Sequence, residues 1–173
     1  MTNMKKKVIY ILHDFKNGGV EVALLSALQN LNNEFDFRLI VLGFVDVDFI
    51  KFLDKKVKDK IVVFPFKTIL FPFYFFNALL YILRFKPDVL VCSLWRSNFI
   101  GALSKLLRKD IFFITFIHST YFHHFFDKIF SLFALRTADK VFVDSLASKK
   151  SIENKNSKLD CEIISFVINE NQN

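Results

Sequence analysis

The 173-residue chain has few of the residues that cross-link or interrupt a fold: 2 cysteines, 3 prolines and 4 glycines. Two cysteines cannot build the disulfide framework of a small secreted domain, and Cys92 and Cys161 have no spacing typical of a metal site. Cys92 also lies in an apolar run that indicates a buried strand. These absences exclude the disulfide-rich secreted class and favour a cytoplasmic location.

Long hydrophobic runs are also missing. The apolar run Val8–Leu12 follows three lysines but has only five residues, whereas the core of a signal peptide needs about 7–15. The uncharged stretch Thr68–Leu83 has 16 residues and would span about 24 Å as a helix, against a hydrocarbon core of about 30 Å. It also contains Pro72 and Asn77, so we expect a buried or interfacial helix there rather than a transmembrane one.

Several motifs of nucleotide sites and hydrolases are absent. No GxGxxG fingerprint, GxxxxGK[ST] loop or GxSxG elbow occurs, so dinucleotide-binding, P-loop and α/β-hydrolase functions lose support. His123 and His124 would point about 100° apart on a helix, so they cannot easily share one metal ion. Asp46-Val47-Asp48 imitates a DxD metal motif, but it precedes an expected helix, where acidic residues favourably meet the helix dipole. We favour that interpretation and expect no metal and no cofactor.

The residues that are present indicate a folded, basic domain. Hydrophobic residues make up 53% of the chain and charged residues 24%, which is typical of a packed core. The 24 phenylalanines receive little functional weight, because an AT-rich genome raises Phe, Lys, Ile and Asn together. The net charge of +7 suits nucleic acid, a phosphorylated small molecule or an anionic membrane surface. The basic runs Lys5–Lys7 and Lys51–Lys60 are interpreted as solvated faces, and no nucleic acid partner is expected.

Apolar runs alternate regularly with segments of helical periodicity. The predicted strands are Lys7–Leu12, Phe35–Phe44, Ile61–Phe64, Asp88–Cys92, Ile111–Ile117, Lys140–Val143 and Cys161–Ile164. The predicted helices are Val20–Leu31, Asp46–Lys56, Phe73–Arg84, Ser97–Leu107 with Ser97 as N-cap, Tyr121–Arg136 and Leu146–Glu153. Continuously apolar strands separated by helices predict an α/β, three-layer domain with a mostly parallel sheet. The order of the strands is not readable from this pattern.

In open α/β sheets, ligands bind at the carboxyl ends of the strands, where the strand order reverses. The loops expected there are His13–Gly19, Ser93–Ser97, His118–Tyr121 and Asp144–Ser145. A functional site is therefore predicted among these four loops.

Four residues of these loops are the candidate substrate- or phosphate-binding residues: Gly18, Gly19, His118 and Ser119. The glycines open a helix, whose N-terminal N–H groups attract anions, and the absence of a Cβ lets a phosphate approach closely. A plain turn before a helix explains the same pattern. His118 follows a strand and can hydrogen-bond a sugar or phosphate or act as an acid or base. A loop histidine without a role remains the alternative.

Trp95 and Arg96 follow the strand Asp88–Cys92. They could form a stacking wall and an anion contact beside the ligand. Packing at the strand end is the alternative for such an aromatic residue.

Five segments, in order along the chain, resemble the N-terminal domain of a GT-B retaining glycosyltransferase of the family 4-like group. They are the strand Lys7–Leu12, the loop Gly18-Gly-Val-Glu21, the strand entry Lys86-Pro-Asp-Val-Leu-Val91, the strand end Phe116-Ile-His118 and the turn Ala138–Ser145. The matches cover nearly the whole chain. The resemblance implies a Rossmann-like fold.

Enzymes of this kind have two Rossmann-like domains that face each other across a cleft. The resemblance implies that residues 1–165 are the N-terminal, acceptor-side domain and that residues 166–173 begin an inter-domain linker, with the C-terminal domain absent. It places Gly18 and Gly19 near the donor diphosphate and His118 near the reacting sugar. The chain departs from the family at Val22, where a basic residue is common, and at Val167–Glu170, where the linker usually reads Ile-Pro-Asn-Gly.

The implied function is the transfer of a sugar from a nucleotide-sugar to a glycan or lipid-linked acceptor in surface polysaccharide synthesis. The donor would bind only with a second domain or subunit, so the chain alone would be inactive or half of a split enzyme. The expected location is cytoplasmic, at the inner face of the cell membrane. One alternative is a non-catalytic α/β module that binds a membrane surface or partner protein. Another is an unrelated flavodoxin-like domain, although no flavin loop is evident.

Overall fold

Seven strands form one parallel sheet in the order β3-β2-β1-β4-β5-β6-β7. The computed structural model describes residues 4–65, 68–118, 121, 124–155 and 161–164. The strands are β1 Lys7–Leu12, β2 Asp36–Val41, β3 Ile61–Val63, β4 Val89–Ser93, β5 Phe112–Ile117, β6 Lys140–Val143 and β7 Cys161–Ile163. The helices are α1 Gly19–Glu34, α2 Lys55–Lys58, the 3-10 helix η1 Thr68–Leu70, α3 Phe71–Phe85, α4 Trp95–Leu107, α5 Phe125–Thr137 and α6 Leu146–Lys155. The predicted α/β, three-layer, parallel architecture is confirmed.

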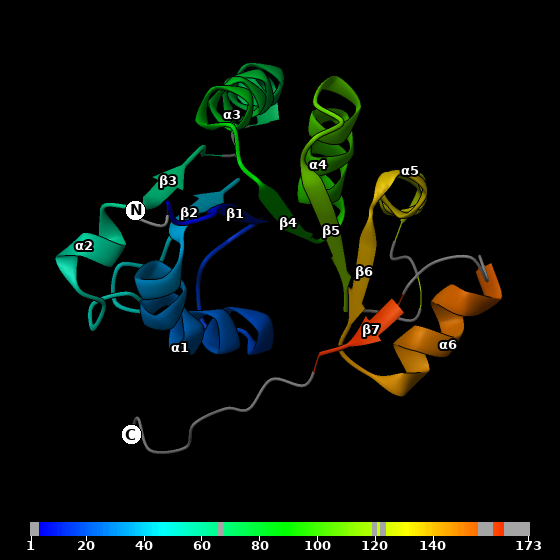
Figure 1. Ribbon diagram of the computed structural model, residues 1–173, viewed down its shortest axis with the longest axis horizontal. Helices are drawn as coiled ribbons and strands as arrows, with labels where there is room; N and C mark the ends of the chain where they lie inside the picture. The colour runs from blue at the N-terminus through cyan, green and yellow to red at the C-terminus, as the bar shows by residue number, and fades with distance from the viewer. Residues whose placement is uncertain (1–3, 66–67, 119–120, 122–123, 156–160, 165–173) are drawn as a thin grey trace.

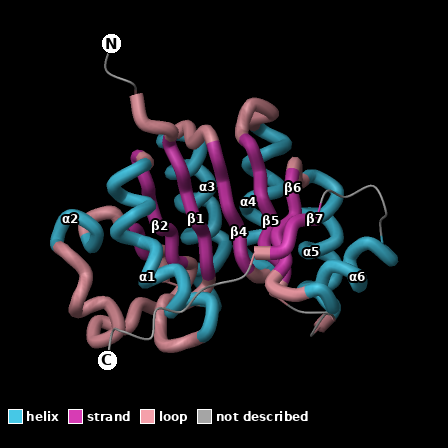
Figure 2. The backbone as a smooth tube through the Cα atoms, turned by 60° about the horizontal axis from the view of Figure 1, so that its bottom comes forward, coloured by secondary structure: helices cyan, strands magenta, loops and turns pink. Residues whose placement is uncertain are grey.

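Helices cover both faces of the sheet. Helices α3, α4 and α5 lie along one face, and α1 lies on the other (Figure 1). Figure 2 shows β2, β1, β4 and β5 side by side, with α1 in front of them and α3 and α4 behind. Alternate residues of β1 enter the two layers, since Ile9 and Ile11 pack under α3 and α4, whereas Tyr10 and Leu12 pack under α1. Both faces of the central strand are therefore buried, which explains its continuously apolar sequence.

Helix α4 approaches the sheet closely at Gly101. A Cβ at this position would lie 2.5 Å from Cε2 of Phe113 and 2.6 Å from Sγ of Cys92. Both neighbours are fully buried, so they have little room to move. Glycine is therefore needed here because α4 rests directly on β4 and β5.

Two of the motif residues support the amino-terminal edge of the sheet. The Asp88 carboxylate accepts a hydrogen bond from the backbone N–H of Lys7 at 2.7 Å. The Asp139 carboxylate accepts one from the backbone N–H of Phe113 at 2.7 Å and pairs with the Lys105 ammonium at 2.7 Å. Asp88 and Asp139 thus join neighbouring strands at the edge opposite the predicted site. Their place in the sequence pattern reflects the fold rather than ligand binding.

The prediction that Ser97 caps its helix is wrong. Helix α4 begins at Trp95, with Leu94 in the N-cap position. Ser97 lies inside the first turn and is fully buried, and its hydroxyl donates to the carbonyl oxygens of Ser93 and Leu94. The serine hydroxyl is thus hydrogen-bonded to the backbone of the preceding turn. Serine makes this bond as well as N-cap bonds, and the spacing of residues in the sequence does not distinguish the two.

Two other predicted helices differ in extent. Most of Asp46–Lys56 forms turns, and only Lys55–Lys58 is helical. The helix predicted from Tyr121 starts at Phe125, because Nδ1 of His124 accepts from the backbone N–H of Asp127 and caps it. Among the described residues, no helix is both long enough and apolar enough to cross a bilayer.

The close approach at Gly101 predicts a stability effect. Gly101→Ala should lower the free energy of unfolding by roughly 1–3 kcal/mol, because the new methyl group overpacks a rigid part of the core. Gly19→Ala is the matched control, since a Cβ there meets nothing within 4 Å and alanine favours helix. Denaturant unfolding measures both, and equal stability of the two variants would contradict the packing argument.

Candidate functional site

The strand order reverses between β1 and β4, which pair directly with each other. The chain leaves β1 towards α1 on one face of the sheet and leaves β4 towards α4 on the other face (Figure 1). Such a divergence opens a crevice at the carboxyl ends of the two strands. Two of the four predicted loops, His13–Gly19 and Ser93–Ser97, therefore flank the switch point.

The amino end of α1 is open on the side of Gly19. Gly18 is the N-cap with extended backbone, at φ −163°, and no side chain caps the helix there. A Cβ on Gly18 would lie 2.4 Å from Oε2 of Glu21, whereas a Cβ on Gly19 would meet nothing within 4 Å. Neither glycine is needed for a left-handed backbone, so the open space beside Gly19 is what supports close approach of an anion to the helix N–H groups.

A buried hydrogen-bonded series joins the three strands beside the crevice. The hydroxyl of Tyr10 on β1 lies 2.6 Å from Oγ of Ser93 at the end of β4. The same Oγ lies 3.4 Å from Nε2 of His118, which follows β5. Burial raises the pKa of the Tyr10 phenol above its usual value, with the charge of Glu21 adding to this. Glu21 also lies against Gly18, so the start of α1 and the series that ends at His118 are both near Tyr10.

His118 is a neutral imidazole. Burial lowers the pKa of His118 to about 4, against the opposing influence of the Asp144 carboxylate. The ring packs on Phe116 at 4.0 Å between centroids. Its Nδ1 is buried and has no hydrogen-bond partner within the described part of the chain. An uncharged ring with one unused nitrogen is suited to hydrogen bonding with a ligand, rather than to ion pairing.

His13 holds the other wall of the crevice. Its Nε2 accepts a hydrogen bond at 3.0 Å from the backbone N–H of Arg96, in the first turn of α4. Burial, followed by the positive charge of Arg96, lowers the pKa of His13 to about 4. The His13 imidazole, which follows β1, therefore caps the amino end of α4. Sequence analysis placed His13 in a candidate loop but assigned it no role, and its position directly after a strand was the available signal.

The turn between β4 and α4 is strained. Leu94 has φ 72° and ψ 162°, a region populated almost only by glycine, at a cost on the order of 1–3 kcal/mol. It lies at the switch point, between Ser93 of the hydrogen-bonded series and Trp95. Backbone strain of this kind concentrates at ligand sites.

The packing alternative for Trp95 is supported. Its ring stacks on Phe130 at 5.8 Å and contacts the edges of His13 and His124 at 5.8 and 5.1 Å between centroids. The Arg96 guanidinium lies 4.9 Å from the centre of the same ring. Trp95 therefore fixes the start of α4 between β1 and α5, instead of offering an open stacking wall.

The other candidate residues are placed as follows. Oδ1 of Asp46 accepts from the backbone N–H of Asp48 at 3.0 Å. These residues form turns and no helix begins there, so the helix-dipole interpretation of the DxD-like sequence is wrong and the first carboxylate instead holds a turn. Ser145 directly precedes α6, and its Oγ accepts from the backbone N–H of Ser148 at 3.2 Å. Within the described ranges, no group of three or more His, Cys, Asp or Glu residues is arranged to hold a metal ion. Ser119 and His123 lie outside the described residues.

Comparison with known proteins identifies the family of the chain. A family model described as Glycosyltransferase Family 4 matches residues 17–165. The crystal structure of the HepE protein of Anabaena in complex with UDP is similar, with TM-score 0.71 and 15% identity over 92% of this chain and 44% of that one. The lipopolysaccharide outer core galactosyltransferase WaaB, in its apo form, gives 0.66 at 13% identity over 92% and 45%. The UDP-GlcNAc 2-epimerase of Methanocaldococcus jannaschii gives 0.59 at 15% identity over 91% and 45%. No curated protein sequence matches the chain.

At these identities the structural similarities show the fold alone, and the fold serves both a transferase and an epimerase. The chain spans less than half the length of each of these three structures. Chemical function therefore has to be argued from the crevice.

The two partly buried histidines make the stability of the fold depend on pH. The pKa values of His13 and His118 are about 4 in the folded chain and about 6.5 in an unfolded chain. Between these values the unfolded state binds more protons. Stability should therefore be constant above about pH 6.5 and fall as the pH drops towards 4, by on the order of 3 kcal/mol for each histidine.

Denaturant unfolding across this pH range measures the effect. His13→Asn and His118→Gln should each be less stable at neutral pH and show a flatter loss of stability in acid. A pH dependence that is unchanged in both variants would contradict the assignment.

Proposed function

Because the chain belongs to Glycosyltransferase Family 4, we propose that it forms the acceptor-side half of an enzyme that transfers a sugar from a nucleotide-sugar. Residues 1–165 act as one domain in this proposal, and a second domain or subunit supplies the nucleotide-binding wall. The complex of the Anabaena protein with UDP supports a uridine diphosphate as the donor's leaving group.

One observation carries the proposal: the open amino end of α1 follows β1, and the neutral His118 is linked to β1 through Ser93 and Tyr10, at the strand switch point. Gly19 leaves the helix N–H groups accessible, and these groups favour the negative charge of a diphosphate. His118 is connected to the same crevice through Ser93 and Tyr10. An anion-binding helix end beside an uncharged hydrogen-bonding ring suits a sugar diphosphate, which combines charged and hydroxyl groups.

The chemistry expected of this half is orientation. The N–H groups at Gly18 and Gly19 would stabilise negative charge on the diphosphate as the sugar leaves. His118 would hydrogen-bond a sugar hydroxyl, because a ring with a pKa of about 4 is not protonated at neutral pH and cannot serve as a cationic contact there. Both walls of the cleft are required to align donor with acceptor and to exclude water.

The acceptor in this proposal is a glycan or a lipid-linked sugar of surface polysaccharide synthesis. A lipid-linked acceptor would require the enzyme to work at the inner face of the cell membrane, as a peripheral protein. The basic net charge of +7 supports contact with an anionic surface.

Gly19→Val tests the anion site. The complete nucleotide-sugar needs the second wall, but the diphosphate of free UDP should bind weakly to this half by itself. The valine side chain should fill the open space and weaken this binding roughly tenfold, since lost N–H contacts are not replaced. Isothermal titration or NMR shifts of the Gly18 and His118 signals measure this. Asn30→Val, at an exposed position in the last two turns of the same helix, is the control. Equal weakening by both substitutions, or no binding of UDP by the unmodified chain, would remove the site.

A second test concerns activity. The purified 173-residue chain, incubated with UDP-sugars and a membrane extract, should transfer no sugar, because it provides one wall of the cleft. Transfer of radiolabel to glycan or lipid measures this directly. Transfer by the chain alone would contradict the requirement for a second wall.

A further inference from the structure

His118 and Asp144 lie beside each other at the carboxyl edge of the sheet. The last paired residues of β5 and β6 are Ile117 and Val143, and His118 and Asp144 directly follow them. Because neighbouring strands of a sheet lie about 4.8 Å apart, the two side chains start close together. The influence of the Asp144 charge on the pKa of His118 agrees with this placement.

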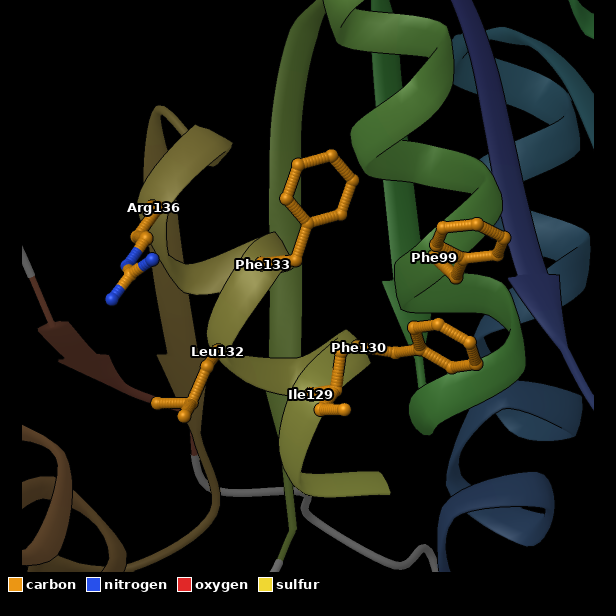
Figure 3. A pocket seen from close by; sticks show the side chains of 6 residues that line it. All are labelled: Phe99, Ile129, Phe130, Leu132, Phe133 and Arg136. Carbon is orange, nitrogen blue, oxygen red and sulfur yellow. The ribbon is translucent and has the colours of Figure 1, made fainter. Parts of the chain in front are cut away.

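His118 lies on the side of the sheet that α1 covers, because its Nε2 faces Ser93 and Ser93 contacts Tyr10 of the core under α1. On the other side, the pocket between α4 and α5 is lined mainly by apolar side chains, with Phe99 and Phe130 ring to ring (Figure 3). A ligand rich in hydroxyl groups is therefore better matched on the side of α1.

The direction of the buried hydrogen bonds follows from where the hydroxyl protons can go. Tyr10 keeps its phenolic proton at neutral pH, because burial raises the pKa of this group. A buried O–H group without an acceptor is destabilising, and the acceptor that the described residues offer is Oγ of Ser93 at 2.6 Å. Tyr10 therefore donates to Ser93.

Ser93 in turn donates its own proton to His118, whose Nε2 lies 3.4 Å from Oγ. If Nε2 carried a proton and donated it, Ser93 would accept twice, and its hydroxyl proton would have no partner among the described residues. With Ser93 as the donor, both hydroxyl protons are bound. The imidazole is neutral, since its pKa is about 4, so its one proton is on Nδ1.

The Nδ1–H group of His118 is thus a donor beside a carboxylate. Nδ1 is buried and has no hydrogen-bond partner within the described ranges. Oδ1 of Asp144 accepts from Oγ of Ser148 at 2.9 Å, which holds the carboxylate in place with a second oxygen to accept from a ligand. A hydroxyl group fits both, because it accepts from N–H and donates to a carboxylate. A phosphate does not fit, because its charge has the sign of Asp144.

We propose that His118 and Asp144 bind one sugar hydroxyl, which accepts from Nδ1–H of His118 and donates to the carboxylate of Asp144. Ser93 and Tyr10 are positioning residues that fix the tautomer without touching the ligand. The sugar as the source of the hydroxyl rests on the proposed function, whereas the tautomer does not. The crevice then has two parts: the start of α1 binds the anion, and the ends of β5 and β6 bind the hydroxyl.

Nitrogen-15 NMR of the full chain, labelled in histidine, tests the tautomer. The ring nitrogens of a neutral imidazole differ strongly in chemical shift according to which one carries the proton, and free histidine favours the Nε2–H form. At neutral pH, His118 should show a protonated Nδ1 and an unprotonated Nε2. The chain has 4 histidines, and the signals that disappear in His118→Gln identify this ring.

A double variant tests the positioning residues. Ser93→Ala with Tyr10→Phe removes both hydroxyls and leaves neither unpaired, so His118 should shift towards the Nε2–H form. Ser93→Thr keeps the donor and should retain Nδ1–H. Ser104→Ala is the matched control, because Ser104 is also fully buried but its hydroxyl bonds to the carbonyl of Ile100 within α4. It should leave the tautomer unchanged.

Titration with methyl glycosides of glucose, galactose and mannose tests the ligand class. At least one should shift the Nδ1 signal of His118, and Asp144→Ala should weaken that response roughly tenfold. Asp59→Ala, at an exposed aspartate that follows α2, is the control and should respond like the unmodified chain. Inorganic phosphate should leave the His118 ring signals unchanged.

Four results would overturn the proposal. They are an Nε2–H form of His118 in the unmodified chain, an Nδ1–H form that persists in the double variant, no response to any of the glycosides, and a response of Nδ1 to phosphate. Failure of UDP to bind, with the glycoside response intact, would remove the proposed sugar-transfer function and leave the hydroxyl site standing. Should the double variant unfold, the tautomer of the unmodified chain decides by itself.

Discussion

The hydrogen bond from the backbone N–H of Arg96 to His13 connects the two segments that diverge at the switch point. Sheet pairing between β1 and β4 ends at Ile11 and Cys92, so beyond those residues side chains connect the two loops to each other. His13 fixes the start of α4, and the Tyr10 hydroxyl fixes Ser93 one step earlier. The distance between the open end of α1 and His118 depends on these two contacts, because they set how far the walls of the crevice stand apart.

Much of the fold was predictable because its strands are buried on both faces. Continuous apolar runs predicted all seven strands, and the bounds of β1 and β6 agree with those predicted. The order of the strands was not predictable, since parallel strands with helical crossovers carry no local signal of their neighbours. The start of α4 was misplaced for a related reason: Ser97 has the sequence of a cap, but its hydroxyl bonds to the preceding turn.

The candidate site was predictable only where a residue type is unusual for its position. Glycines at a helix start and a histidine at a strand end are such residues, and the structure links the histidine to β1 through Ser93 and Tyr10. Tyr10 could not be recognised, because within an apolar run it resembles any core residue and its hydroxyl gains a role only once β4 is known to lie beside β1. The 24 phenylalanines were discounted as a matter of composition. The exposure of Phe73, Phe76, Phe125 and Phe126 on α3 and α5 could be recognised only once it was known which side of each helix meets the sheet.

The neutrality of His13 and His118 has a consequence for the electric field at the proposed anion site. With pKa values of about 4, neither ring changes charge over the interval in which a free imidazole titrates. In the proposed site, the attraction for an anion would then come from the peptide dipoles of α1, which exchange no proton with the solvent. Neither histidine therefore changes the electrostatic potential at the mouth of the crevice over the ordinary range of cellular pH. A diphosphate arriving there would meet the same field in a mildly acidified cell as in a neutral one.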